Sequence, residues 1–215
     1  MKIQIEKEKV QAAYKDACGS VKAVFESLFG KEVLEEAAKP TLDDYRTIKS
    51  YEDACEVLGL SPILSENRNK ALCAQFSDHY DFRQNMPKHI IALMKLEIIS
   101  RALWGKNFQP KPDAEGKEIY WYPWFALYTK KEMEEMSEEN RKSLGGALLA
   151  GGANRGATAG FGYLKTNNRS SYSSAYIGFR LCQETPEKAE YFGKQFIELW
   201  AEYLAYGFTV TGHME

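Results

Sequence analysis

Residues 145–182 read GGALLAGGANRGATAGFGYLKTNNRSSYSSAYIGFRLC, and this segment differs in composition from the rest of the chain. It holds eight glycines, which disfavour a helix because glycine has so much backbone freedom to lose. Small, aromatic and β-branched residues lie between the glycines. We therefore predict short strands joined by tight turns, near residues 146–151, 158–164 and 174–182.

The middle of this segment is rich in Tyr, Ser and Asn, with Arg and Lys among them. Tyr offers a large and rigid contact area, and Ser and Asn offer adaptable hydrogen bonds, so the mixture is typical of binding surfaces. An ordinary polar loop of a β-rich domain is the alternative. The candidate ligand-binding residues are Asn154, Arg155, Thr158, Tyr163, Lys165, Asn167, Asn168, Arg169, Ser171, Tyr172 and Tyr176.

The flanks of this segment carry other patterns. Residues 117–128 are dense in aromatic strand formers, and Pro123 among them predicts either two short strands or an edge strand with a bend. Residues 130–143 are charged and predict a loop or a short surface helix. A helix with a wide apolar face is expected over residues 186–205, opened by Pro186.

The N-terminal half has helical periodicity. We expect a helix over residues 7–29, broken near Gly19, a capped helix over 50–58, and a long helix over 87–103. The chain is therefore predicted to be α+β, with a helical region at residues 1–105 and a β-containing region at 106–215. One continuous domain is the alternative.

The charge balance and the hydropathy pattern limit the classes of partner. The formal net charge is −2, which gives no overall attraction to nucleic acid or anionic lipid. No apolar run reaches the roughly 18 residues needed to cross a bilayer, and the charged N-terminus has no apolar secretory core behind it. We expect a protein made in the cytoplasm, without a nucleic-acid partner or membrane insertion.

The sequence shows no catalytic pattern. Its four cysteines lie at long spacings without a C-x-x-C pair, and the glycines match neither a P-loop nor a dinucleotide-binding spacing. Acidic pairs lie in polar runs beside lysines. Cys182 is expected to be a buried core thiol, with a nucleophile as the alternative. We therefore expect no enzyme activity, no cofactor and no metal site.

Two short motifs carry a family resemblance. Residues 151–154 (GGAN) and 177–181 (IGFRL) resemble the closing signature of the formylglycine-generating-enzyme branch of C-type lectin-like folds, which also occurs in variable proteins of diversity-generating retroelements. The resemblance implies a compact, irregular β region, with Gly-Phe-Arg-Leu as a strand that places Phe179 and Leu181 on one face. The family's Ser-Trp is replaced by Ala153-Asn154 and its active-site cysteine pair is absent, so the enzyme activity is not implied.

Three further segments resemble proteins of phages and prophages of gut Bacteroidales: residues 49–59, 120–125 and 190–196. This resemblance implies a virion-associated protein that recognises a host-surface protein or glycan. The alternative is a structural virion component, a head or tail accessory protein that contacts other virion proteins. A homo-oligomer is compatible with both.

Overall fold

The computed structural model describes residues 7–30, 39–62, 87–111, 115–144, 146–153, 159–170, 179–205 and 208–214. The chain forms two compact units, Met1–Lys39 and Pro40–Glu215. The sequence analysis placed a division near residue 105, whereas the contacts divide the chain after residue 39. Helices and an antiparallel sheet occur in one chain, so the α+β class is confirmed.

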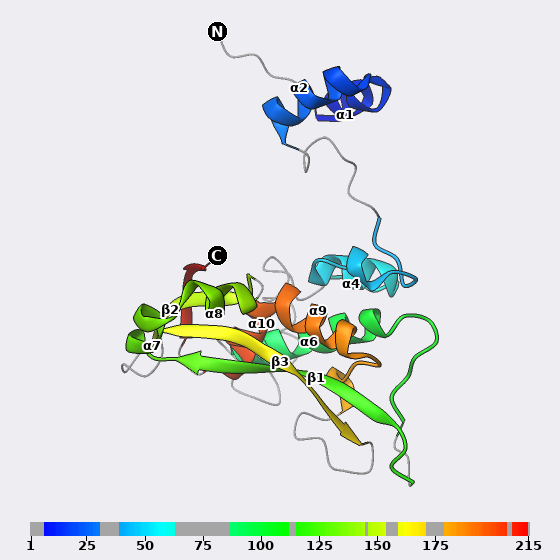
Figure 1. Ribbon diagram of the computed structural model, residues 1–215. Coiled ribbons are helices and arrows are strands. Elements are labelled where there is room, and N and C mark those ends of the chain that lie inside the picture. The colour runs from blue at the N-terminus through cyan, green and yellow to red at the C-terminus, as the bar shows by residue number, and fades with distance from the viewer. Residues whose placement is uncertain are drawn as a thin grey trace. The chain divides into compact units, whose positions relative to one another are not determined.

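The first unit contains two short helices, α1 (Lys7–Asp16) and α2 (Gly19–Phe29) (Figure 1). The break falls at Ala17 and Cys18, one residue before the predicted position, and Cys18 is the N-cap residue of α2. Gly30 ends α2 with a φ of 77°, a conformation that favours glycine, and donates its N–H to the Glu26 carbonyl.

In the second unit the predicted helices near residues 50 and 90 are confirmed. A 3₁₀ turn, η1 (Tyr45–Thr47), precedes α4 (Tyr51–Val57), and Ser50 and Asp53 form the capping box of α4. The long helix α6 (Lys88–Trp104) begins directly after Pro87. Among the described residues, no helix has both the length and the apolar character to cross a bilayer.

The sheet is antiparallel, in the order β1-β3-β2-β4 (Figure 1). Its strands are β1 (Ile119–Tyr128), β2 (Leu148–Ala153), β3 (Gly160–Ser170) and β4 (Phe208–His213). Two of the three strands predicted in the glycine-rich segment are thereby confirmed. β1 lies at an edge of the sheet, as one of the two predicted alternatives had it, and its pairing register with β3 shifts between Trp124 and Phe125. Two short helices, α7 (Lys130–Glu135) and α8 (Glu138–Ser143), follow β1.

The third predicted strand is wrong where the structure describes it. Phe179, Arg180 and Leu181 form a 3₁₀ turn, η2 (Phe179–Leu181). Phe179 packs edge-on against Tyr120, Arg180 pairs with Glu97, and Leu181 joins the main core. Successive side chains of a 3₁₀ turn point about 120° apart, so the turn reaches three different partners, which an alternating strand would not.

The C-terminal part also differs from its prediction. The expected helix over 186–205 is divided into α9 (Pro186–Gln195) and α10 (Ile197–Leu204), because Phe196 leaves the helical conformation with a φ of −111°. After α10, residues up to His213 form β4, an element that the sequence analysis did not predict, in which exposed and half-buried residues alternate. Pairing with β2 satisfies the backbone groups along one edge of this strand.

Both faces of the sheet are covered at the end that holds β2. Leu148 and Leu149 are consecutive and therefore point to opposite faces, yet neither is exposed. Leu149 lies in a core built with α4, α6, α9 and α10, and Leu148 lies in a smaller cluster with Met133 of α7. Phe125 of β1 stacks on Phe161 of β3 in the main core, with ring centroids 5.0 Å apart. The sheet thus rests on a packed base from which β1 and β3 extend.

Candidate recognition surface

The extended part of β1 and β3 forms a two-stranded segment, here called the outer ribbon: residues 119–124 of β1 paired with residues 165–170 of β3. β2 pairs with β3 only at residues 160–162, so the outer ribbon lies beyond β2. Figure 1 shows β1 and β3 running on past β2 as one long twisted pair. Rigid scaffolds commonly position the residues that bind a partner.

An irregularity in β3 decides which side chains the outer ribbon exposes. Trp124 is opposite Lys165, whereas the next residue, Phe125, is opposite Tyr163, so Leu164 has no opposite residue. Phe125 and Trp124 are consecutive and point to opposite faces of the sheet. Each opposite residue on β3 points to the same face as its partner on β1. The bulge at Leu164 therefore turns Tyr163 towards the core and Lys165 away from it.

The prediction that Tyr163 is exposed is wrong. Its side chain is only 5% exposed and packs against Phe125 and Gly193 in the main core. Burial raises the pKa of its phenol to about 12. Tyr163 is a core residue that holds β3 against α9, and it does not belong to a binding surface.

Four candidate residues lie together on the outer ribbon. Lys165 and Asn168 are exposed, and Asn167 and Arg169 are half-buried. The strand register places Lys165, Asn167 and Arg169 on the face of β3 that matches Tyr120, Tyr122 and Trp124 of β1. The other candidates, Asn154, Arg155, Thr158, Ser171, Tyr172 and Tyr176, lie outside the described residues.

Trp124 is the functional candidate that the sequence analysis missed. Its side chain is 42% exposed, and the guanidinium carbon of Arg169 lies 5.9 Å from its ring centroid. This separation is within the range of a cation–π interaction. Lys165 lies directly across the strand pair from Trp124. The sequence signal near Trp124 was Pro123, since a proline within a strand indicates an edge strand or a bulge.

The outer ribbon is anchored at several points along its length. Trp121 exchanges two backbone hydrogen bonds with Gln183, of 2.9 and 2.8 Å. The Tyr120 hydroxyl donates to the Lys111 carbonyl, and Ser170 Oγ donates to the Gly116 carbonyl. Arg169 donates to the Asn168 carbonyl at 2.7 Å, which restrains its side chain over Trp124. These contacts favour a preformed surface over one that orders only on binding.

Cys182 lies beneath the outer ribbon, in a cluster with Tyr120 and Tyr122. It is fully buried, and burial raises the pKa of its thiol to about 12. The expectation of a buried core thiol is confirmed, and the thiol is protonated at neutral pH. Within the described ranges there is no group of three or more His, Cys, Asp or Glu side chains that could hold a metal ion.

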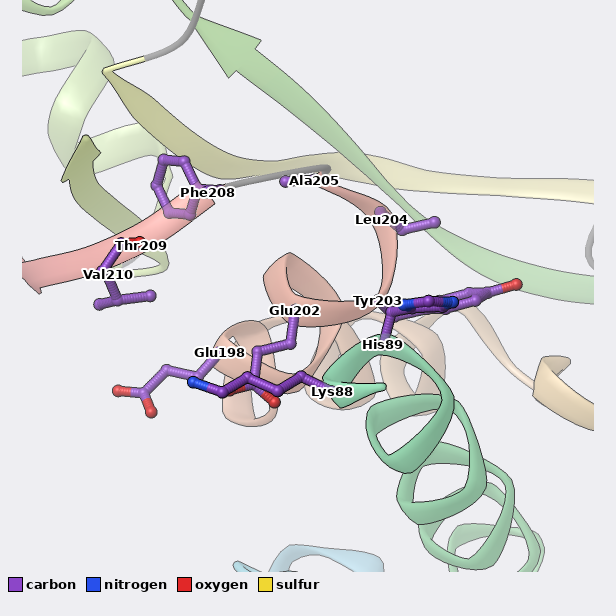
Figure 2. Close-up of a pocket in the computed structure, with 10 residues that line it drawn as sticks. All are labelled: Lys88, His89, Glu198, Glu202, Tyr203, Leu204, Ala205, Phe208, Thr209 and Val210. Carbon is purple, nitrogen blue, oxygen red and sulfur yellow. The ribbon is translucent and has the colours of Figure 1, made fainter. Parts of the chain in front are cut away.

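A cavity of about 570 Å³ lies elsewhere in the second unit, between the start of α6, α10 and β4 (Figure 2). The cavity wall contains the ammonium group of Lys88 and the carboxylates of Glu198 and Glu202. It therefore does not present charge of one sign to a ligand. Glu198 is already bonded to His213, at 2.6 Å. Among the described residues, none of those predicted from the sequence as site residues lines this cavity; its lining residues are Lys88, His89, Glu198, Glu202, Tyr203, Leu204, Ala205, Phe208, Thr209 and Val210.

No protein-family model, curated protein or solved structure matches this chain.

Proposed function

We propose that this chain is a non-enzymatic recognition protein of a phage or prophage, and that it binds a host-surface protein or glycan through the outer ribbon. The observation that carries the proposal is the arrangement of Trp124, Arg169 and Lys165: an exposed indole with one cation on its ring and another across the strand pair. The phage context comes from the resemblance of residues 49–59, 120–125 and 190–196 to Bacteroidales phage proteins.

The chemistry of this arrangement suits a polar ligand. Trp and Arg are the residues most enriched among those that dominate binding energy, because they combine large contact area with directed polar groups. Two cations beside an aromatic ring attract carboxylates, sulfates or acidic sugars, and the side-chain amide of Asn167, which lies on the same face, adds hydrogen bonds. An acidic surface glycan or an acidic protein loop fits this set best.

The geometry also explains how one scaffold could display different ligand-binding residues. The outer ribbon is fixed by backbone pairing and by the buried side chains of Tyr120 and Tyr122, so we infer that exposed side chains such as Trp124 and Lys165 could change without loss of the fold. This is the property that the resemblance to C-type lectin-like variable proteins implies. A lectin-like relationship of residues 106–182 remains part of the proposal.

The test is binding of the fluorescently labelled full chain to intact cells of a panel of gut Bacteroidales strains, measured by flow cytometry. The wild-type chain is expected to label at least one strain. Trp124→Ala and Arg169→Ala should each weaken that labelling by about tenfold or more, as is usual for residues at the centre of an interface.

Two control variants make comparable truncations of an apolar and a cationic side chain outside the outer ribbon. Leu127→Ala removes an apolar side chain from β1 that is 50% exposed, and Lys142→Ala removes an exposed cation from α8. Both should label cells as the wild type does. Absence of labelling on every strain, or equal loss in the matched variants, would count against recognition through the outer ribbon.

A structural role in the virion is the second candidate. Exposed apolar side chains on the sheet, Ile119 at 51% and Leu164 at 49%, favour it because they could contact neighbouring subunits. Assembly and adsorption of particles that carry the Trp124→Ala chain distinguish the two roles. Intact particles that fail to adsorb support recognition, and failure to assemble supports the structural role.

A further inference from the structure

One face of the outer ribbon, here called the Trp124 face, offers hydrogen-bond donors to a ligand. The strand register gives this face residues 120, 122 and 124 of β1 and 165, 167 and 169 of β3. The side chains of Lys165, Arg169 and Trp124 can only donate. The side-chain oxygen of Asn167 already accepts from the Asn168 N–H at 2.9 Å, so this amide meets a ligand mainly as a donor. A ligand group that only accepts hydrogen bonds therefore fits the Trp124 face.

The two cations of the Trp124 face converge on the indole. Lys165 and Arg169 are four residues apart, so their Cα atoms lie about 13 Å apart along β3. Arg169 spans this separation, since its guanidinium carbon lies 5.9 Å from the Trp124 ring centroid, and Lys165 lies directly opposite Trp124. Among the described residues, no carboxylate pairs with either cation. One acidic group beside the indole is therefore within reach of both.

The apolar area of the Trp124 face is narrow. Trp124 is 42% exposed, whereas Tyr120 and Tyr122, its neighbours on the same face of β1, are 2% and 4% exposed. The face of an aromatic ring carries partial negative charge, which attracts the C–H groups of a sugar ring. A protein partner needs a broader contact, since specific protein interfaces bury roughly 800 Å² on each side. One indole among donors thus favours a sugar ring over a protein surface.

We propose that the outer ribbon binds an acidic glycan, with a sugar ring against Trp124 and a carboxylate or sulfate of that glycan between Lys165 and Arg169. This inference rests on the proposed function and narrows its ligand to one chemical class. The planar guanidinium of Arg169 matches two oxygens of a carboxylate or sulfate, so Arg169 selects the acidic group. Trp124 selects the sugar ring.

Biolayer interferometry of the full chain on four immobilised polymers tests the proposal. Polygalacturonate and dextran sulfate join sugar rings to acidic groups, dextran has sugar rings without charge, and polyglutamate has charge without sugar. The ionic strength is set to roughly 0.15 M, which screens attraction between distant charges. The wild type should bind polygalacturonate or dextran sulfate at least about tenfold more tightly than dextran or polyglutamate. The tighter of the two identifies the acidic group as carboxylate or sulfate.

Two conservative variants separate the two parts of the site. Trp124→Leu keeps an apolar side chain but removes the flat ring, and Arg169→Lys keeps the charge but removes the planar donor pair. Each should weaken binding to the preferred polymer by about tenfold, with an unchanged circular dichroism spectrum. Lys142→Ala, which removes an exposed cation from α8, should bind as the wild type does.

The opposing results are distinct. Equal affinity for polyglutamate overturns the proposal in favour of an acidic protein partner, and equal affinity for dextran overturns it in favour of a neutral sugar. A chain that labels Bacteroidales cells but binds neither acidic polysaccharide contradicts the acidic glycan and leaves the proposed function standing. A chain that binds an acidic polysaccharide but labels no strain contradicts the proposed function and supports the sugar site.

Discussion

Tyr163 shows what composition can and cannot predict about a single residue. The sequence analysis grouped it with exposed polar residues because Tyr, Asn and Ser surround it. In the structure the bulge at Leu164 reverses the faces, so Tyr163 is buried while Lys165, two positions on, is exposed. A regular strand would have placed both on one face. The position of a bulge depends on tertiary packing and leaves no clear signal in one sequence.

Tyr163→Ala should unfold the second unit more readily and not simply remove a ligand contact. Truncating a buried aromatic side chain costs about 3–5 kcal/mol in free energy of unfolding, whereas Tyr163→Phe, which removes only the hydroxyl, should cost about 1 kcal/mol. Urea denaturation measures both values. If the alanine variant matches the wild type in stability, the side chain is not in the core.

Cys182 gives a prediction about alkaline pH. Burial raises its pKa from the ordinary 9.0 to about 12, so the unfolded thiol ionises first as the pH rises. Between pH about 9 and about 12 the folded chain therefore binds more protons than the unfolded chain, and the free energy of unfolding falls as the pH rises. The ionisation of Cys182 contributes a decrease of up to about 1.4 kcal/mol per pH unit. Below pH 9 the contribution is constant.

The Cys182→Ala variant isolates this contribution. Tyrosines with raised pKa values, such as Tyr191, titrate in both chains and cancel in the comparison. Urea unfolding at pH 8, 9, 10 and 10.5 should give a shallower decline for the variant than for the wild type. Parallel declines would mean that the thiol ionises equally easily in the folded and unfolded chains.

Among the secondary-structure elements, those with a strong local signal were predicted well. α4 has its Ser50–Asp53 capping box and α6 has Pro87 and a regular apolar face, and both lie where the sequence placed them. Elements defined by distant contacts were missed: the break at Phe196 between α9 and α10, the turn η2, and the strand β4. Their conformations are fixed by what they pack against, which periodicity does not reveal.

The contact between α9 and β1 depends on a glycine within the helix. A Cβ atom at Gly193 would lie 2.6 Å from Pro123 Cβ and 2.8 Å from a ring carbon of Tyr163. Alanine normally favours a helix over glycine, but at this position it would push α9 away from the sheet. Gly193→Ala should therefore lower the free energy of unfolding by about 1–3 kcal/mol.

Gly152 on β2 provides the control for this substitution, since a Cβ there meets nothing within 4 Å. Gly152→Ala should change the free energy of unfolding by less than about 0.5 kcal/mol. Thermal and urea denaturation of the two variants compare them directly. Equal stability of Gly193→Ala and the wild type would show that α9 does not approach β1 as closely as described.

For the whole molecule, the sequence predicted the α+β class and located part of the candidate surface. Lys165, Asn167, Asn168 and Arg169 do come together on one strand pair. Trp124, which lies across from them, could not be assigned to the same surface because its partner strand begins more than thirty residues later and the register is set only in the fold. The surface is therefore a property of the assembled sheet.

Hydroxyl-radical footprinting of the full chain, with and without outer-membrane vesicles from a strain that the protein labels, addresses recognition most directly. Oxidation of Trp124 should fall when vesicles are added, because its exposed indole becomes covered, while oxidation of the exposed Leu127 stays the same. Unchanged oxidation of Trp124 on vesicles that have demonstrably captured the protein would contradict recognition through the outer ribbon.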